Sequence, residues 1–305
     1  MASLKDKLEN ALNEARILLL GGQVLIGAGF RSVFTDGFSR LPFPSQVIQI
    51  ASLWLMTIGL GILLLPASYH FIVEGGENTR SFHELVTRIL EWALFPFALG
   101  LGVAVFAVGE KVMTTIAGAV AGIFITAFAF SGWYILAIYK RKNTPPLPKE
   151  EPSKITEKIK EALIEARMVL PGAQALLGFQ VANTFTNSFE QLPRVAQWLH
   201  LASLLSVAVA TILLIAPAAY HRIAEHGEDS EEFYNLAGRF LLTALVFLGL
   251  GISFDLWVIF RKISDSILLS NVLSAMTLLF FYGVWFGYNA LKRNGKAAQM
   301  IRLAG

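Results

Sequence analysis

The chain has no cysteine, and other signatures of chemistry are missing with it. Without cysteine there is no disulfide, no thiolate nucleophile, no zinc–thiolate site and no c-type haem attachment. A P-loop, a Rossmann glycine run, an HExxH helix and a nucleophile elbow are also absent from the sequence. We therefore expect a protein that is not an enzyme and that carries no cofactor.

Charged residues are scarce as well. Asp, Glu, Lys and Arg make up 15% of the 305 residues, whereas soluble domains have about 25%. The formal net charge of +3 is too small to indicate a nucleic-acid-binding surface. These shortages exclude an ordinary soluble domain and a nucleic-acid partner, and they point to the lipid bilayer as the main solvent.

Apolar sequence is what the chain has in abundance. Hydrophobic residues make up 55% of it, and its mean hydropathy is +0.58. A membrane span needs about 20 mostly apolar residues. The sequence predicts an all-α integral membrane protein with about eight transmembrane helices, over residues 17–38, 47–72, 85–108, 112–139, 168–189, 198–223, 236–260 and 267–290. A short amphipathic helix precedes the first and fifth spans, and we expect it to continue into them.

The two halves of the chain repeat one another at a shift of 151 residues. Glu14 and Arg16 fall on Glu165 and Arg167. The same shift pairs Gln23 with Gln174, Tyr69 with Tyr220, His70 with His221, Glu74 with Glu225 and Arg88 with Arg239. So many uncommon residues in one register indicate duplication and fusion. The proline-rich segment 140–152 is predicted to be the linker, which gives four-helix repeats over residues 1–148 and 149–305.

Four spans per repeat return the chain to its starting side. The two repeats are therefore predicted to be parallel, related by a pseudo-two-fold axis along the membrane normal. Lys and Arg favour the cytoplasmic side. If the N-terminus is inside, 19 of the 25 Lys and Arg residues are inside, and those outside are Arg31, Arg40, Lys111, Arg194, Arg261 and Lys262. We therefore predict that both termini and the linker are cytoplasmic.

The polar residues that the halves share form a candidate cluster at the cytoplasmic helix ends. Its members are Glu14, Arg16, Tyr69, His70, Glu74 and Arg88 in the first half and Glu165, Arg167, Tyr220, His221, Glu225 and Arg239 in the second. Histidine titrates near neutral pH, so one interpretation is a proton or anion site. The alternative is an ion-pair belt that joins the helix ends, and we favour it.

Gln23 and Gln174 lie seven residues beyond Arg16 and Arg167, on the same helix face. A polar line with glycine neighbours is typical of a pathway border or of close helix packing, and packing is the favoured interpretation.

Two acids lie within predicted spans, Glu91 in the third and Asp255 in the seventh. Neither has an acidic counterpart in the other half, where the equivalent positions are Leu242 and Ala104. Asp255 is the better candidate for an ion-coupling carboxylate, although we expect it near enough to the outer surface to snorkel. His200 replaces Gln49 of the first half, and with His70 and His221 it raises the alternative of a bis-histidine haem site, which we do not favour.

The second half carries the run Leu170-Pro171-Gly172-Ala173-Gln174-Ala175-Leu176-Leu177-Gly178-Phe179-Gln180, followed by Phe185-Thr186, Leu192-Pro193, His200-Leu201 and Pro217-Ala218-Ala219-Tyr220-His221-Arg222. With these residues it resembles a bacterial family of small four-helix membrane proteins of unknown function, some members of which carry the label sodium:proton antiporter. The first half departs from this pattern at Leu20, Gln49 and Phe71. The resemblance implies a tandem duplicate that resides in the bacterial cytoplasmic membrane.

Two functions are compatible with these features. The favoured hypothesis is an accessory or scaffolding subunit whose partners are other membrane-protein subunits, because the spans lack a paired charge at mid-membrane. The alternative is a proton-coupled or small-ion transporter. The halves differ at Gln49/His200, Phe71/Arg222 and Ala104/Asp255, so a working site is expected in the second half.

Overall fold

The computed structural model describes residues 4–135, 138, 154–223 and 230–304. Within these residues the fold is all-helical and contains no β-strand, and eight helices are long and apolar enough to cross a membrane. The predicted number of spans is thereby confirmed on length and composition, and the chain is a membrane-embedded helical protein. The linker 140–152 and Glu225 lie outside the described residues, so the boundary near residue 148 stays a prediction.

The first half forms an antiparallel bundle. Its elements are α1 (Leu4–Val33), α2 (Asp36–Ser39), α3 (Phe43–Leu63), α4 (Leu65–Tyr69), the π-helical turn η1 (His70–Glu74), α5 (Arg80–Val112), α6 (Thr115–Phe130) and the π-helical turn η2 (Ser131–Ile135). The α1 helix is unbroken, so the amphipathic segment does continue into the first span, as predicted.

The second half follows the same plan. It consists of α8 (Ile155–Thr184), α9 (Asn187–Glu190), α10 (Arg194–Ile223), α11 (Glu231–Ser264), α12 (Ile267–Tyr282), the π-helical turn η3 (Gly283–Gly287) and α13 (Tyr288–Ala304). The starts of α8, α9, α10 and α11 lie 151 residues after those of α1, α2, α3 and α5. The internal repeat of the sequence is therefore also a repeat of helix boundaries.

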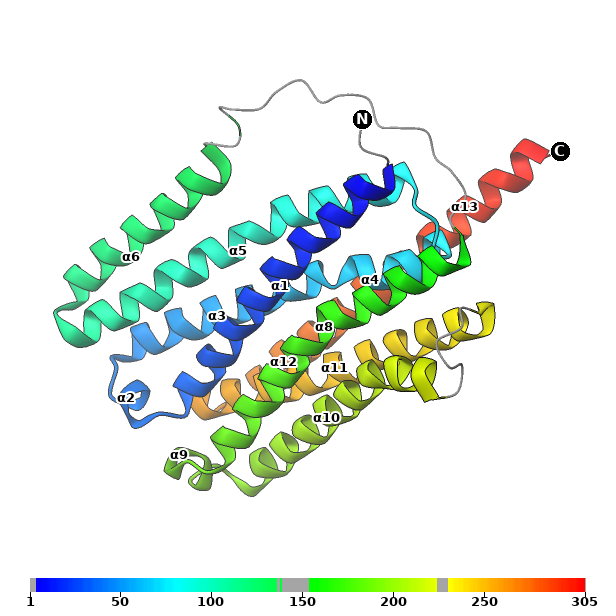
Figure 1. Ribbon diagram of the computed structural model, residues 1–305. Helices are drawn as coiled ribbons and strands as arrows, with labels where there is room; N and C mark the ends of the chain where they lie inside the picture. The colour runs from blue at the N-terminus through cyan, green and yellow to red at the C-terminus, as the bar shows by residue number, and fades with distance from the viewer. Residues whose placement is uncertain (1–3, 136–137, 139–153, 224–229, 305) are drawn as a thin grey trace.

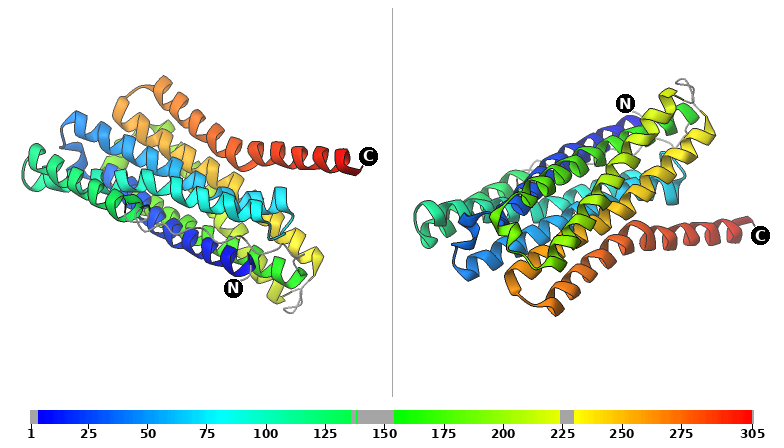
Figure 2. Two further views of the ribbon diagram at one scale, coloured as in Figure 1. Left: turned by 90° about the horizontal axis from the view of Figure 1, so that it is seen from above. Right: turned by 90° about the horizontal axis from the view of Figure 1, so that it is seen from below.

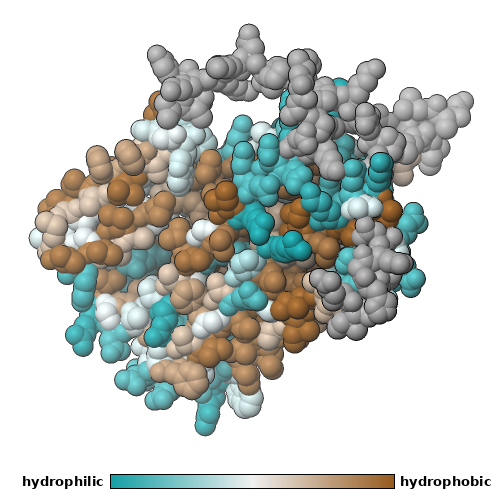
Figure 3. All heavy atoms as spheres, viewed as in Figure 1, coloured by the Kyte–Doolittle hydropathy of each residue, from teal (hydrophilic) through white to brown (hydrophobic). Residues whose placement is uncertain are grey.

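The bundle has two distinct ends. We call the end where α1 and α8 begin the near end, and the end that holds α2 and α9 the far end; α1 and α8 run in the same direction between them (Figure 1). Brown, apolar side chains cover the middle of the molecule in Figure 3, while teal, polar ones gather towards the ends. The helices α5 and α11 contain 33 and 34 residues, about 50 Å of helix. Because the hydrocarbon core is only about 30 Å thick, their ends extend beyond it. The orientation in the membrane and the pseudo-two-fold axis stay predictions.

Two seams make up much of the contact between the halves. The first is the packing of α1 against α8, which lie side by side in Figures 1 and 2. The second joins η3 and α12 to α3 and α4: the indole of Trp54 donates to the hydroxyl of Thr277 (2.8 Å), and that of Trp285 donates to the carbonyl of Gly61 (2.7 Å). The helix α6 lies at the outer edge and packs mainly along α5. The C-terminal α13 projects away from the bundle in Figure 2.

The close packing of α1 against α8 requires small residues. Each helix supplies one, at a different position along the seam. A Cβ atom on Gly27 of α1 would collide with the ring of Phe179, and one on Gly172 of α8 would collide with the amide of Gln23. At the repeat-equivalent glycines, Gly178 and Gly21, an added Cβ would have no atom of another described element within 4 Å. Both halves thus carry these glycines, but the close approach occurs at Gly27 in the first half and at Gly172 in the second.

This difference supplies a matched stability test. We predict that Gly27→Leu lowers the free energy of unfolding by about 1–3 kcal/mol, because an overpacked seam must open. Gly178→Leu should leave stability unchanged or raise it, since leucine favours a helix more than glycine does. Thermal unfolding of both variants in the same detergent measures the contrast. Equal melting temperatures for the two variants would contradict the asymmetric seam.

Candidate functional site

The buried imidazole of His70 lies between the two halves, at the near end of the bundle. His70, the first residue of the π-helical turn η1, places Nδ1 2.7 Å from Glu165 Oε1 and Nε2 3.7 Å from Glu161 Oε2. Glu161 and Glu165 lie one turn apart on α8, so both carboxylates face the same direction. His70 and Glu165 are each 1% exposed. We call His70, Glu161 and Glu165 the inter-repeat site, because the imidazole comes from one half and both carboxylates from the other.

The local sequence explains how His70 is held. The ring of Phe82, on α5, stacks on the imidazole with a centroid separation of 4.5 Å and an interplanar angle of 1°. After η1 the chain reverses through Gly75 and Gly76, whose φ angles of 59° and 80° are positive and favour glycine. This reversal brings Asn78 back to α8, where its amide donates to Glu161 Oε1 (2.9 Å). The turn between α4 and α5 therefore closes over the two carboxylates.

Further charges lie around the inter-repeat site. Glu74, which is 7% exposed, accepts two hydrogen bonds from Lys296 Nζ of α13, at 2.7 and 2.8 Å. Lys158 of α8 pairs with Glu77 at 2.6 Å. These lysines join the loop of the first half to helices of the second half. The inter-repeat site itself contains two carboxylates and one imidazole, so their protonation states are coupled.

A second acid–base pair is buried in the second half, towards the far end. His200 Nδ1 of α10 lies 2.8 Å from Asp255 Oδ1 of α11, and His200 Nε2 lies 3.1 Å from the backbone carbonyl of Gln180. The amide of Gln180 donates to Asp255 Oδ2 (2.6 Å) and to Ser203 Oγ (2.8 Å), and Ser203 donates to the carbonyl of Gly251 (2.6 Å). All four side chains are at most 3% exposed. We call Gln180, His200, Ser203 and Asp255 the far site.

The geometry of the far site fixes its proton count. A carbonyl oxygen can only accept, so Nε2 of His200 carries a proton that it donates to Gln180. One further proton then lies between Nδ1 and Asp255, either as an imidazolium–carboxylate pair or as a neutral imidazole with a carboxylic acid. Both forms are neutral overall, which is what a low-dielectric surrounding favours. Removal of that proton would leave a net negative charge inside the bundle.

The expectations for Asp255 and Glu91 have different outcomes. Asp255 was expected to snorkel, and this was wrong: it is buried and bonded to His200, because the α10–α11 packing places the imidazole beside it. The side chain of Glu91 is exposed, and its backbone carbonyl accepts from the hydroxyl of Tyr134 (2.6 Å). The structure also offers no facing pair of His70 and His221, because the nitrogens of His70 face carboxylates.

The structure divides the predicted polar cluster. It brings together His70, Glu165 and Tyr69, whose ring stacks on Phe82, and places Glu74 beside them. It does not bring in the side chains that are exposed, which are Glu14, Arg16, Arg88, Arg167, Gln174 and Arg239. The arginines of the predicted cluster therefore lie outside the buried group around His70. Tyr220 and His221 are partly buried and contact the ring of Phe233 at 6.2 and 4.6 Å.

Some site residues escaped the sequence reasoning. Glu161 was missed because its counterpart in the first half is Asn10, and Asn78 was missed because it lies in a loop. The signal that could have found Glu161 is its spacing of four residues from Glu165 on one face of α8. His200 and Asp255 were each noted, but nothing in the sequence placed them side by side.

The helix α8 connects the two sites. Glu165 and Gln180 are 15 residues apart on it, about 22 Å at 1.5 Å per residue. Between them, Gln23 of α1 packs against Gly172, and its Oε1 atom is buried without a hydrogen-bond partner among the described residues. A polar side chain thus lies about half-way between the two acid–base sites.

The far site allows a test by a double-mutant cycle that uses residues the protein itself carries. The first half has Gln49 and Ala104 where the second has His200 and Asp255. We predict that His200→Gln and Asp255→Ala each lower the free energy of unfolding by about 3–5 kcal/mol, because each leaves a buried partner unpaired. The double variant should lose less than the sum of the two, by about 1–3 kcal/mol. Denaturant unfolding in micelles measures the cycle, and strictly additive losses would show that the two side chains do not interact.

Comparison with known proteins agrees with the repeat. A family described as a "Family of unknown function (DUF6328)" matches the chain twice, over residues 3–137 and 149–289. No curated protein and no solved structure matches it significantly. Because the two matches cover most of the chain, in tandem and one in each half, the chain belongs to this family of unknown function and carries two copies of its unit.

Proposed function

We propose that this protein is a proton-coupled transporter of small ions, with the far site and the inter-repeat site as its proton-binding groups. The observation that carries the proposal is the buried His200–Asp255 pair inside membrane-spanning helices. Ionisable residues at such positions are costly and usually mark proton relays or ion pathways. The accessory-subunit hypothesis was favoured because no paired charge was apparent within the spans, and this pair removes that reason.

The chemistry of the far site suits proton binding and release. The proton between His200 and Asp255 can lie on either residue without a change in net charge. Either residue can therefore release it. The side-chain amide of Gln180 donates to the carboxylate of Asp255, and its backbone carbonyl accepts from the imidazole of His200. Gln180 therefore holds both groups in a fixed relative position. Once the proton leaves, the negative site would favour a cation in its place. Exchange of a proton for a cation is the elementary step of an antiporter.

The inter-repeat site is suited to the same role at the other end of α8. Its imidazole lies between two carboxylates, one of which, Glu165, has an Oε2 atom buried without a partner among the described residues. If the near end is cytoplasmic, as the lysines and arginines predict, this site faces the cytoplasm. Gln23 of α1 lies between the sites, where its amide packs against Gly172 of α8. We further propose that the chain resides in the bacterial cytoplasmic membrane and catalyses no covalent reaction.

The accessory-subunit role is the second candidate, and one observation favours it. The continuous helix from α12 through α13 covers residues 267–304, about 57 Å of helix. Its C-terminal part projects away from the bundle (Figure 2). On α13, Lys292 and Arg293 are exposed, whereas Lys296 is bonded to Glu74. Such an extension is available for another subunit at the membrane surface.

Reconstitution into vesicles tests the transporter. With a pH-sensitive dye inside and an imposed sodium or potassium gradient, we predict a change of internal pH that is faster than in empty vesicles. The His200→Gln/Asp255→Ala double variant should reduce the rate to that of empty vesicles, because no proton-binding group remains at the far site. Glu165→Gln should also reduce it, since the carboxylate partner of His70 is lost.

The matched control is Glu14→Gln, which changes the repeat-equivalent of Glu165 on an exposed face of α1. This variant should retain the wild-type rate. A wild-type protein that moves no protons in either gradient would overturn the transporter. Recovery of the chain from its native membrane in a stable complex with other membrane proteins would then support the accessory role.

A further inference from the structure

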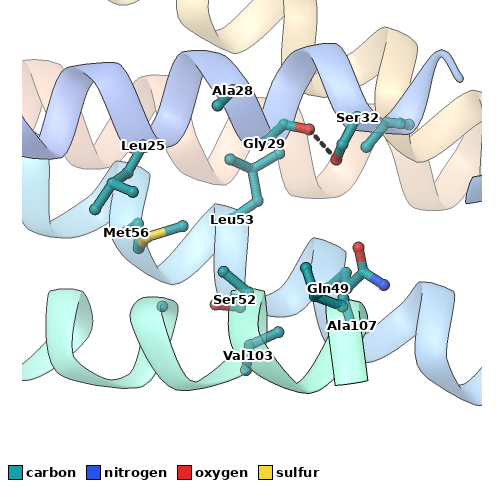
Figure 4. A pocket seen from close by; sticks show the side chains of 14 residues that line it. Leu25, Ala28, Gly29, Ser32, Gln49, Ser52, Leu53, Met56, Val103 and Ala107 are labelled. Carbon is teal, nitrogen blue, oxygen red and sulfur yellow. Dashed lines mark hydrogen bonds between the residues drawn. The ribbon is translucent and has the colours of Figure 1, made fainter. Parts of the chain in front are cut away.

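The first half contains a cavity at the place where the second half has the far site. Its volume is about 250 Å³, and it lies between α1, α3 and α5 (Figure 4). Four of its lining residues are the repeat-equivalents of the far-site residues: Gly29 of Gln180, Gln49 of His200, Ser52 of Ser203 and Ala104 of Asp255. The same position in the fold therefore holds a closed polar network in one half and an open space in the other.

The exchange of side chains explains the space. Where the second half has Gln180 and Asp255, the first half has Gly29 and Ala104. The first half therefore lacks two of the side chains that fill the far site. The two that stay polar lose their partners. Gln49 Nε2 and Ser52 Oγ are buried and make no hydrogen bond within the part of the chain that the structure describes. Ser52 is only 7% exposed, whereas Ser203 in the same position bonds to both Gln180 and Gly251.

Unsatisfied buried donors are costly, at about 1–3 kcal/mol each. A site that retains two of them beside an open space is better explained by an occupant than by a packing fault. Ser32 is not available for this role, because its hydroxyl donates to the carbonyl of Gly29 (2.8 Å; Figure 4). The amide of Gln49 can only donate through Nε2, so its partner must be an acceptor.

The rest of the lining sets the chemistry of the occupant. All fourteen residues that line the cavity are uncharged, and a buried charge without a partner would be strongly unfavourable there. Leu25, Leu53, Met56 and Val103 form apolar walls. Because Ala28 and Ala104 are exposed, the cavity opens on the outer surface of α1 and α5, within their membrane-spanning segments. Access is therefore from the bilayer.

We propose that this cavity binds a small neutral molecule dissolved in the membrane, one with an apolar body and a carbonyl-type acceptor that Gln49 and Ser52 bond. The size is sufficient, since an apolar cavity of about 150 Å³ is known to bind benzene, which leaves room here for a ring with a polar substituent. The two halves have thus diverged into a proton-binding far site and a ligand-binding cavity.

Fluorine NMR on the full chain in nanodiscs tests the proposal with two probes of the same shape. The probe 4,4-difluorocyclohexanone has the carbonyl acceptor, and 1,1-difluorocyclohexane lacks it. We expect the ketone to bind to the wild type and to show line broadening beyond that in empty nanodiscs. Gln49→Leu/Ser52→Ala should weaken ketone binding about fivefold, the contribution of about one net hydrogen bond, and leave the hydrocarbon probe unchanged.

The matched variant fills the cavity with the residues of the other half. Gly29→Gln/Gln49→His/Ala104→Asp should abolish binding of both probes, and the donor variant above serves if this triple variant does not fold. Equal broadening of the ketone in wild type, donor variant and empty nanodiscs would overturn the proposal. Ketone binding that occurs in ether-linked but not in ester-linked lipids would assign the site to a lipid ester carbonyl, and would also overturn it.

Discussion

The requirement that a charge buried among membrane helices must have a partner is the constraint on which this structure depends. His70, Glu165, His200 and Asp255 are all nearly inaccessible, and each is paired with a group of opposite acid–base character on a neighbouring element. Neither pair can form within one helix, so each fixes the relative position of two. The His70–Glu165 pair joins the two halves, and the His200–Asp255 pair joins α10 to α11. Because breaking such a pair costs several kcal/mol, these contacts specify one arrangement among many that hydrophobic helices could adopt.

Duplication gives the protein an internal comparison that a single unit lacks. The helix boundaries agree between the halves, yet equivalent positions have acquired different surroundings. Glu165 is buried and bonded, whereas Glu14 is exposed. A Cβ atom on Gly27 would collide with Phe179, whereas one on Gly178 would have no atom of another described element within 4 Å. The second half has filled the space between its helices with a polar network, and the first has left it open. A fused pair can diverge in this way because each half needs only to complement the other.

The fold was largely predictable from the sequence, and the site only in part. Length and hydropathy determine the spans, and the shift of 151 residues predicts where α8 begins once α1 is known. The identity between the halves also pointed to His70 and Glu165. It did not show that these two residues contact each other. It failed where the halves differ: Glu161 has Asn10 as its counterpart, so no repeated signal marked it. It also grouped Arg16 and Arg167 with the buried residues, because an identity between halves does not reveal which side of a helix faces the neighbouring one.

The central claim is that the two buried imidazoles belong to separate proton-binding sites. Nitrogen-15 NMR of histidine-labelled protein in nanodiscs tests it most directly, with the signals assigned by substitution and followed between about pH 5 and pH 9, where histidine sites titrate. The account predicts that Asp255→Ala changes the protonation profile of His200 and leaves that of His70 unchanged, and that Glu165→Gln does the reverse. Profiles that neither substitution alters, or that both alter alike, would contradict it.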